Sequence, residues 1–201
     1  MQQVLERAKA LGFLGPGAVS EHLEHAQAYE AACDGAFTGR AADLGSGGGV
    51  PALPLALAWP ASTWVLIDRS ERRAAFLEDA VRTLGISDRV QVRNEPAERS
   101  GRDLELRGQL HLVVARSFGP PGTAAECAAP LLALGGLLVV SEPPSPSTAR
   151  WPTDELARLG LGPARLLTTS TGTIAVLEQR TPCPDRYPRT EGKPAKAPLF
   201  R

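Results

Sequence analysis

The feature that most constrains the fold is a glycine-rich stretch that directly follows a short apolar run. Residues 40–44 are typical of a strand, and the sequence Gly-Ser-Gly-Gly-Gly occupies residues 45–49. Residues 51–58 are typical of a helix, because Leu and Ala dominate and Pro51 is tolerated in a first helical turn. Glycine permits positive φ and close approach of a ligand, and a helix start offers free N–H donors. The stretch therefore predicts a ligand-binding turn between a strand and a helix.

From residue 40 onward, strand-like and helix-like segments alternate. We expect strands at 40–44, 64–67, 89–93, 110–115 and 137–140, and helices at 51–58, 70–84, 96–99, 123–134 and 151–159. Residues 164–169 and 173–178 flank a Thr-Gly turn, which is typical of an antiparallel hairpin. Alternation of strands and helices favours right-handed crossovers and parallel pairing. The sequence therefore predicts an α/β fold, a doubly wound, seven-stranded, mostly parallel sheet with a C-terminal antiparallel hairpin.

The pattern divides the chain into three segments. Residues 1–39 form an N-terminal helical segment with expected helices at 5–11 and 19–32. Residues 40–180 form the α/β domain, and a length of 201 residues suits a single such domain. Residues 181–201 contain five prolines and are rich in basic side chains. Because proline removes a backbone donor, we expect this tail to be extended, whether it is docked or loose.

Charge and apolar patterning exclude several classes of protein. The chain has 22 basic and 22 acidic residues, so it lacks the basic excess of proteins that hold nucleic acid by bulk charge. It shows neither a long apolar run nor a signal peptide, so we expect no membrane association. Three scattered cysteines favour a reducing cytoplasm, and no residue spacing indicates a metal site. The oligomeric state is left open.

Acidic side chains are expected at the carboxyl ends of three predicted strands. Asp43 directly precedes the glycines, where it could bind an amine of a ligand. Asp68 ends the second strand, where a carboxylate can accept both hydroxyls of a ribose. Ala97 and Glu98 follow the third strand and could hold an adenine. These residues favour S-adenosylmethionine over a dinucleotide, since Asp43 suits a cationic amine better than a pyrophosphate; a plain packing turn is the structural alternative.

Motifs spread over the chain strengthen this interpretation. They are Asp43-Leu-Gly-Ser-Gly-Gly-Gly-Val-Pro51, Leu66-Ile-Asp68, Arg72-Arg73, Phe76-Leu77, Ala97-Glu98, Val114-Ala-Arg116-Ser117, Tyr187-Pro188-Arg189, Gly192, Pro194-Ala195-Lys196 and Pro198-Leu199. Together they resemble the RsmG (GidB) family, the 16S ribosomal RNA guanine-N7 methyltransferases. The glycine loop is generic to class I methyltransferases, whereas the Ala-Arg-Ser element and the tail are more specific. The resemblance covers about residues 40–120 and 182–199.

The resemblance implies a Rossmann-like class I methyltransferase that uses S-adenosylmethionine and acts on ribosomal RNA or the small ribosomal subunit. Carried over by position, it implies cofactor contacts at Gly45, Val50, Ala97, Glu98 and Arg116. With the residues chosen above, the candidate cofactor-binding set is Asp43, Gly45, Gly47, Gly49, Val50, Asp68, Ala97, Glu98 and Arg116. The candidate RNA-binding set is Arg116, Arg186, Arg189, Lys193 and Lys196.

The expected chemistry needs no obvious catalytic side chain. Guanine N7 carries its own lone pair, so methyl transfer to it depends on positioning, and we assign no catalytic residue. Cys127 lies in an Ala-rich helix and is expected to pack, whereas Cys183 lies between two prolines and could in principle act as a nucleophile. For the basic tail residues, the alternative that they are simply solvated also stays open.

Two departures from the family pattern leave other functions open. Residues 1–39 lack the family's Asn-Leu-Thr signature, and Ser141-Glu142-Pro143-Pro144 stands where the family has Lys-Gly after the fifth strand. A methyltransferase of the same fold that acts on a small molecule or another RNA is therefore one alternative. A cofactor-binding protein without turnover is the other.

Overall fold

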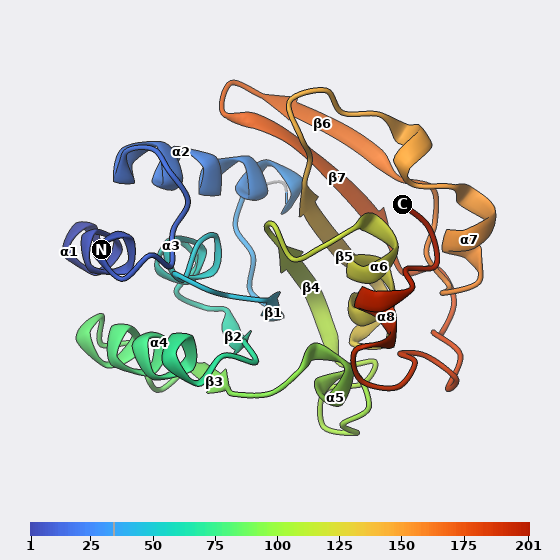
Figure 1. Cartoon of the computed structure of the whole chain (residues 1–201), viewed down its shortest axis with the longest axis horizontal. Helices are drawn as coiled ribbons and strands as arrows, with labels where there is room; N and C mark the ends of the chain where they lie inside the picture. Colours follow the sequence, from blue (N-terminus) through green and yellow to red (C-terminus); the bar gives the residue numbers. More distant parts are fainter. Residues whose placement is uncertain (34) are drawn as a thin grey trace.

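The computed structural model describes residues 1–33 and 35–201, and the strands in this part of the chain form one seven-stranded sheet (Figure 1). The strands are β1 Arg40–Leu44, β2 Thr63–Ile67, β3 Val90–Arg93, β4 Leu110–Ala115, β5 Leu132–Ser141, β6 Arg165–Thr169 and β7 Gly172–Glu178. Their order is β3-β2-β1-β4-β5-β7-β6. Strands β1 to β5 pair in parallel, and β7 pairs antiparallel with both β5 and β6. The predicted fold class is confirmed.

Helices cover both faces of this sheet. They are α1 Gln2–Ala10, α2 Val19–Glu30, α3 Ala52–Ala58, α4 Glu71–Thr83, α5 Ala97–Ser100, α6 Pro121–Ala128, α7 Thr153–Ala157 and α8 Lys193–Lys196, with short 3-10 turns at Ala31–Cys33 and Thr148–Arg150. No helix among the described residues is both long and apolar enough to cross a bilayer. The helices expected in the N-terminal segment are present, and the second of them passes into the 3-10 turn before residue 34.

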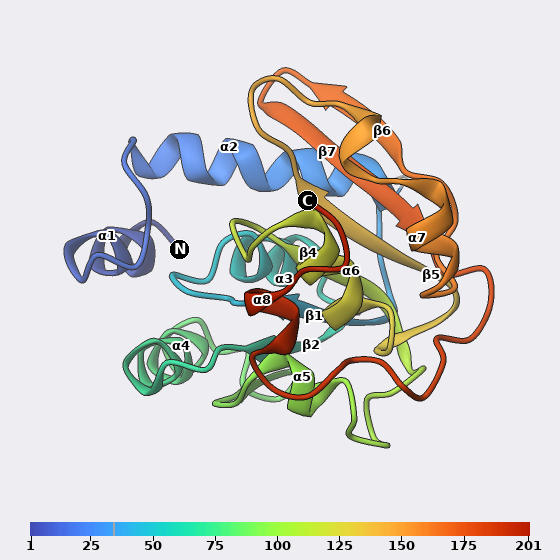
Figure 2. The same ribbon diagram turned by 45° about the vertical axis from the view of Figure 1, so that its right-hand side comes forward.

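Alternation along each strand divides the core into two layers. In β4, Leu112 and Val114 pack with α1 to α4, whereas Val113 and Ala115 pack with α5, α6, α7 and the C-terminal tail. Because successive side chains of a strand point to opposite faces, a strand buried on both faces is apolar throughout. Figure 2 shows α2 and α6 on opposite sides of the sheet.

The strand order sets the position of the site. From β1 the chain passes through α3 to β2 and through α4 to β3, and it then returns to the other side of β1 to form β4. The crossovers therefore diverge at β1, and a crevice opens outside the carboxyl ends of β1 and β4. Ligands of doubly wound sheets bind at such a point.

The sequence-based helix at 123–134 is wrong in extent. Helix α6 ends at Ala128, and β5 already begins at Leu132 and runs through Gly135 and Gly136. Pro130 explains the difference, since proline has no N–H for the next helical hydrogen bond. Gly135, with φ of 77°, lies within the early part of the strand, where the register with β4 shifts.

The C-terminal tail is docked. Tyr187 and Phe200 are buried in the same layer as α6, and α8 lies beside α6 in both views (Figures 1 and 2). The main anchor is Glu126, whose side chain is 0% exposed. Arg189 donates from Nε and Nη2 to its two carboxylate oxygens, at 2.8 and 2.6 Å. The tail is thus tied to the sheet domain by a buried, bidentate ion pair.

We predict that Arg189→Ala lowers the free energy of unfolding by about 3–5 kcal/mol, because it leaves the buried Glu126 carboxylate without its counter-charge. Urea unfolding measures this change. The matched control is Arg158→Ala, which removes an exposed pair with Glu155 and should cost less than about 1 kcal/mol. Equal small losses in the two variants would contradict the anchoring role of Arg189.

Candidate active site

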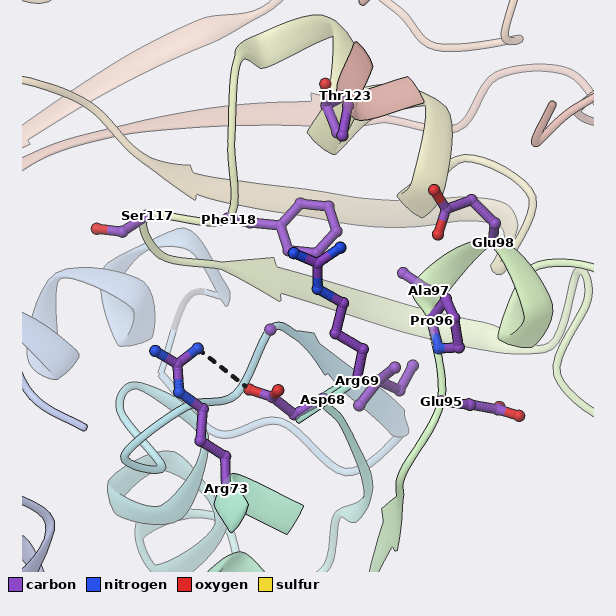
Figure 3. A pocket seen from close by; sticks show the side chains of 13 residues that line it. Asp68, Arg69, Arg73, Glu95, Pro96, Ala97, Glu98, Ser117, Phe118 and Thr123 are labelled. Atoms are coloured by element: carbon purple, nitrogen blue, oxygen red, sulfur yellow. Dashed lines mark ion pairs between the residues drawn. The ribbon is translucent and has the colours of Figure 1, made fainter. Parts of the chain in front are cut away.

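A cavity of about 220 Å³ lies at the carboxyl edge of the sheet (Figure 3). Its walls are Gly45 after β1, Ile67 to Arg69 at the end of β2, Arg73 on α4, Glu95 to Glu98 after β3, Ser117 and Phe118 after β4, Thr123 on α6 and Ala195 in the tail. Four of the nine predicted cofactor residues line it: Gly45, Asp68, Ala97 and Glu98. The structure thus brings the strand-end residues of β1, β2 and β3 to one cavity.

The glycine loop needs its glycines for different reasons. Gly45 has φ of 68°, and a Cβ there would lie 2.8 Å from Cδ2 of Phe118, which forms the cavity wall. Gly49 has φ of 85°, and a Cβ there would lie 2.3 Å from Cδ1 of the buried Leu53. Gly45 therefore keeps the loop open to the cavity, whereas Gly49 allows the loop to pack on α3.

Asp68 fastens this loop to β2. Its carboxylate is 3% exposed, and Oδ2 accepts the Gly47 N–H at 2.9 Å while Oδ1 accepts the Ser70 N–H at 2.9 Å. Arg73 lies 3.9 Å away, along the dashed line in Figure 3. Each carboxylate oxygen has a second lone pair, so Asp68 can hold the loop and still accept from a ribose hydroxyl. That ribose contact stays a prediction.

Asp43 lies behind the loop and outside the cavity walls. It is 1% exposed, and among the described residues its Oδ2 has no hydrogen-bond partner. Burial, with a smaller contribution from the nearby Asp68 charge, raises the pKa of Asp43 to about 7. A buried carboxylate oxygen without a partner is costly, so the position suits the cationic amine of S-adenosylmethionine. The residues present therefore fit the cofactor.

Arg116 is held by the N-terminal segment. Its Nη2 donates to Nδ1 of His22 at 2.8 Å, and His22 Nε2 lies 3.2 Å from the Gly15 carbonyl oxygen. Because a guanidinium only donates, Nδ1 accepts and Nε2–H donates to Gly15. The imidazole is thereby fixed between the α1–α2 turn and β4. The sequence pattern did not single out His22, whose role depends on contacts that are distant in the sequence.

The same N-terminal turn covers the glycine loop. A Cβ on Gly48 would lie 2.6 Å from Cδ2 of Leu14 and 2.9 Å from the Phe13 carbonyl oxygen. Val50 packs into a small cluster with Leu5 and Val19 rather than facing the cavity. The loop is therefore clamped between its own sheet and the segment that precedes it.

The C-terminal tail contributes Ala195 to the wall of the cavity. Glu98 Oε1 accepts the Gly192 N–H at 3.0 Å, and Thr123 Oγ1 donates to the Pro194 carbonyl oxygen at 2.8 Å. These bonds hold Ala195 against the cavity. The proline-rich tail, which sequence reasoning left as docked or loose, is part of the site.

The basic tail residues fall into two groups. Arg186, Lys193 and Lys196 are exposed, and Arg186 lies over the Tyr187 ring at 5.0 Å. Arg189 is committed to Glu126, as described above. The three exposed cations are thus free to meet a phosphate, whereas Arg189 has a structural role; RNA contact by any of them stays a prediction.

The backbone is strained where the cavity meets β4. Ser117 is alone among the described non-glycine residues in having a clearly positive φ, at 54°. Such conformations cost about 1–3 kcal/mol and concentrate at functional sites.

The two cysteines considered in the sequence analysis are not poised to act as nucleophiles. Burial raises the pKa of the Cys127 thiol well above its ordinary value and that of the Cys183 thiol to about 12, so neither thiol ionises readily.

Comparison with known proteins identifies the family. Residues 18–144 match the family described as rRNA small subunit methyltransferase G. The chain belongs to this family. It is 34% identical to the ribosomal RNA small subunit methyltransferase G of Synechococcus sp. strain RCC307, over 78% of this chain and 69% of the relative. It is 38% identical to the protein of that name from Prochlorococcus marinus strain MIT 9303, over 80% of this chain and 68% of the relative.

Solved structures place this family member in the class I methyltransferase fold. A SAM-dependent O-methyltransferase from Thermotoga maritima is 12% identical and superposes with a TM-score of 0.61, over 89% of this chain and 71% of the other. A 16S rRNA N2 G1207 methyltransferase from T. thermophilus, in complex with AdoMet and guanosine, is 22% identical. It superposes with a TM-score of 0.50, over 74% of this chain and 37% of the other. Family and fold together identify S-adenosylmethionine as the cofactor.

We predict that Gly45→Ala weakens S-adenosylmethionine binding about tenfold or more, because the new methyl group displaces Phe118 into the cavity; tenfold corresponds to about 1.4 kcal/mol. Calorimetric titration measures the affinity. Gly108→Ala is the matched control, since Gly108 also has φ of 68° but a Cβ there would have no described atom within 4 Å. The control reproduces the backbone strain of the substitution without the contact to Phe118, and wild-type affinity in Gly45→Ala would contradict the placement of the cofactor.

The raised pKa of Asp43 predicts that the free energy of unfolding depends on pH. The folded protein keeps the Asp43 proton up to a pKa of about 7, whereas the unfolded chain releases it near the ordinary value of 3.8. Stability therefore falls as pH rises between these two values, since the folded state binds more protons there. Urea unfolding should show this fall in the wild type relative to Asp43→Asn, and a constant difference between the two across pH 4–8 would contradict it.

Proposed function

We propose that this chain transfers the methyl group of S-adenosylmethionine to N7 of a guanine in 16S ribosomal RNA. The observation that carries the proposal is the extent of the family match. It spans residues 18–144, which include every residue that lines the cavity except Ala195. The cavity and the family resemblance therefore concern the same part of the chain.

The cavity suits a reaction that depends on placement. The cofactor supplies a sulfonium methyl group, and guanine N7 needs no proton removed before it attacks. Alignment of two reactants can lower a barrier by about 7–11 kcal/mol. Residues Gly45, Ser117 and Phe118 supply close packing where the reacting atoms would meet, and the strained Ser117 fixes the start of the segment after β4.

Recognition of RNA is proposed for the exposed cations of the tail. Arg186, Lys193 and Lys196 are exposed on the segment whose Ala195 lines the cavity. Phosphate contacts of this kind orient a nucleic acid without reading its sequence. Because the whole chain has no net charge, a local contact of this kind is favoured over broad electrostatic binding. Ribosomal RNA as substrate also supports a cytoplasmic location.

Nucleoside analysis of small-subunit ribosomal RNA from a deletion strain tests the proposal. We expect the loss of one 7-methylguanosine, restored by the wild-type gene and by the surface control Arg158→Ala, but not by Asp68→Ala. An unchanged 7-methylguanosine content would refute the N7 assignment. Cofactor binding without methyl transfer to any RNA would favour a non-catalytic protein instead.

A further inference from the structure

The residue after Asp68 is an arginine that the site described above leaves unused. Arg69 lines the cofactor cavity and is exposed, and its side chain forms neither an ion pair nor a hydrogen bond with any described residue. Its neighbour Arg73 turns toward Asp68, whereas Arg69 rises from the end of β2 toward Phe118 (Figure 3). The opening of the cavity therefore carries a guanidinium with all of its donors available.

Neither ion pairing nor helix stability accounts for Arg69. The acidic residues on the neighbouring wall have other partners, since Glu95 accepts the Ser100 hydroxyl at 2.6 Å and Glu98 accepts the Gly192 N–H at 3.0 Å. Arg69 also lies just before α4, and a cation is unfavourable at the start of a helix, where the peptide dipoles sum to a positive charge. An anion that binds from outside is the partner that such a cation suits.

Free cations also flank the part of the cavity wall that the tail provides. Lys193 and Lys196 lie on either side of Ala195 in the sequence, and both side chains are exposed and without an ion pair or hydrogen bond to the rest of the described chain. Thr123, which holds Pro194 of the tail, lies across the cavity from Asp68 in Figure 3. Positive charge therefore stands on both sides of the opening.

A nucleotide that presents its base to the cofactor leaves its backbone at this opening. Enzymes that modify a base take it out of the stack, and the phosphates on both sides of that nucleotide then stay outside the site. A guanidinium holds a phosphate with two parallel hydrogen bonds, and a lysine ammonium holds it as a point charge. Cations on both sides of the opening match this arrangement of phosphates.

We propose that the opening of the cavity is a two-sided phosphate clamp for a single RNA strand. Arg69 holds a phosphate on one side of the target nucleotide, and Lys193 and Lys196 hold a phosphate on the other side. This inference rests on the proposed function, because it adds Arg69 to the tail cations and gives the path of the RNA strand across the cavity.

The salt dependence of RNA binding tests the clamp. An unmodified transcript of 16S ribosomal RNA is titrated, at a series of salt concentrations, with the protein saturated with S-adenosylhomocysteine. Each phosphate that a cation neutralises on a single strand contributes about 0.7 to the slope of log affinity against log salt concentration. We expect Arg69→Ala to lower the slope by about 0.7 and to bind the RNA about tenfold more weakly, the loss of one charge-assisted contact.

Arg165→Ala is the matched control. Arg165 is also exposed, and its side chain also lacks an ion pair or hydrogen bond within the described chain, but it lies on β6 and does not line the cavity. This variant removes the same charge and should keep the wild-type affinity and slope. Arg69→Lys keeps the charge without the fork of donors, so it should keep the slope and lose part of the affinity. Arg69→Ala combined with Lys196→Ala should lower the slope by about 1.4.

Cofactor affinity distinguishes a phosphate contact from a cofactor contact. Calorimetric titration of S-adenosylhomocysteine into Arg69→Ala should give the wild-type affinity, because Asp68, Ala97 and Glu98 are unchanged. A weakened cofactor affinity in this variant would assign Arg69 to the cofactor and overturn the clamp. Thermal unfolding shows that each variant is folded.

The outcomes also separate the clamp from the proposed function. An unchanged slope in Arg69→Ala, an equal change in Arg165→Ala, or no binding of the transcript by the wild type overturns the clamp. If 7-methylguanosine is then still lost in the deletion strain, the proposed function stands and only the phosphate contact is wrong. A slope that depends on Arg69 supports the clamp even where the modified atom proves to be other than N7.

Discussion

The contact on which the rest of the site depends is the pair of hydrogen bonds that Asp68 accepts from Gly47 and Ser70. It joins the end of β2 to the loop after β1 and to the residue that precedes α4. A carboxylate that is 3% exposed has to be satisfied by nearby donors, so the loop cannot move away without leaving the charge buried and unpaired. The floor of the candidate cofactor cavity is therefore set without a ligand.

Two segments at opposite ends of the chain hold the site from either side. The N-terminal segment covers the glycine loop and orients Arg116 through His22. The tail is anchored by the buried pair of Glu126 and Arg189 and places Ala195 at the cavity wall. Among the described residues, neither segment contributes a strand to the sheet. The tail adds Ala195 to the cavity wall, and the N-terminal segment holds the glycine loop in place, which suits a reaction that depends on placement.

The alternation of strands and helices was enough to predict the sheet and the meeting of Gly45, Asp68 and Glu98 at one edge. The reason is that the ends of parallel strands share an edge whatever the details of packing. The predicted helix at 123–134 is too long at its C-terminal end, because the Ala-rich composition favours a helix up to residue 134 whereas Pro130 prevents it from continuing. Phe118, Thr123 and Ala195 were not selected, since they converge through packing over long sequence separations. A charged residue within an Ala-rich helix is the one sequence feature that indicates a buried role for Glu126. The sequence predicts an RNA contact for its partner Arg189 because the two residues are far apart in the chain.

The prediction that matters most is that S-adenosylmethionine binds in the cavity at the carboxyl ends of β1, β2 and β3, against the loop that Asp68 fastens. A crystal structure with S-adenosylhomocysteine tests it most directly. We predict that the ribose hydroxyls lie on Asp68 and that the adenine lies beside Ala97 and Glu98. A cofactor bound outside this cavity, or one that does not touch Asp68, would contradict the prediction.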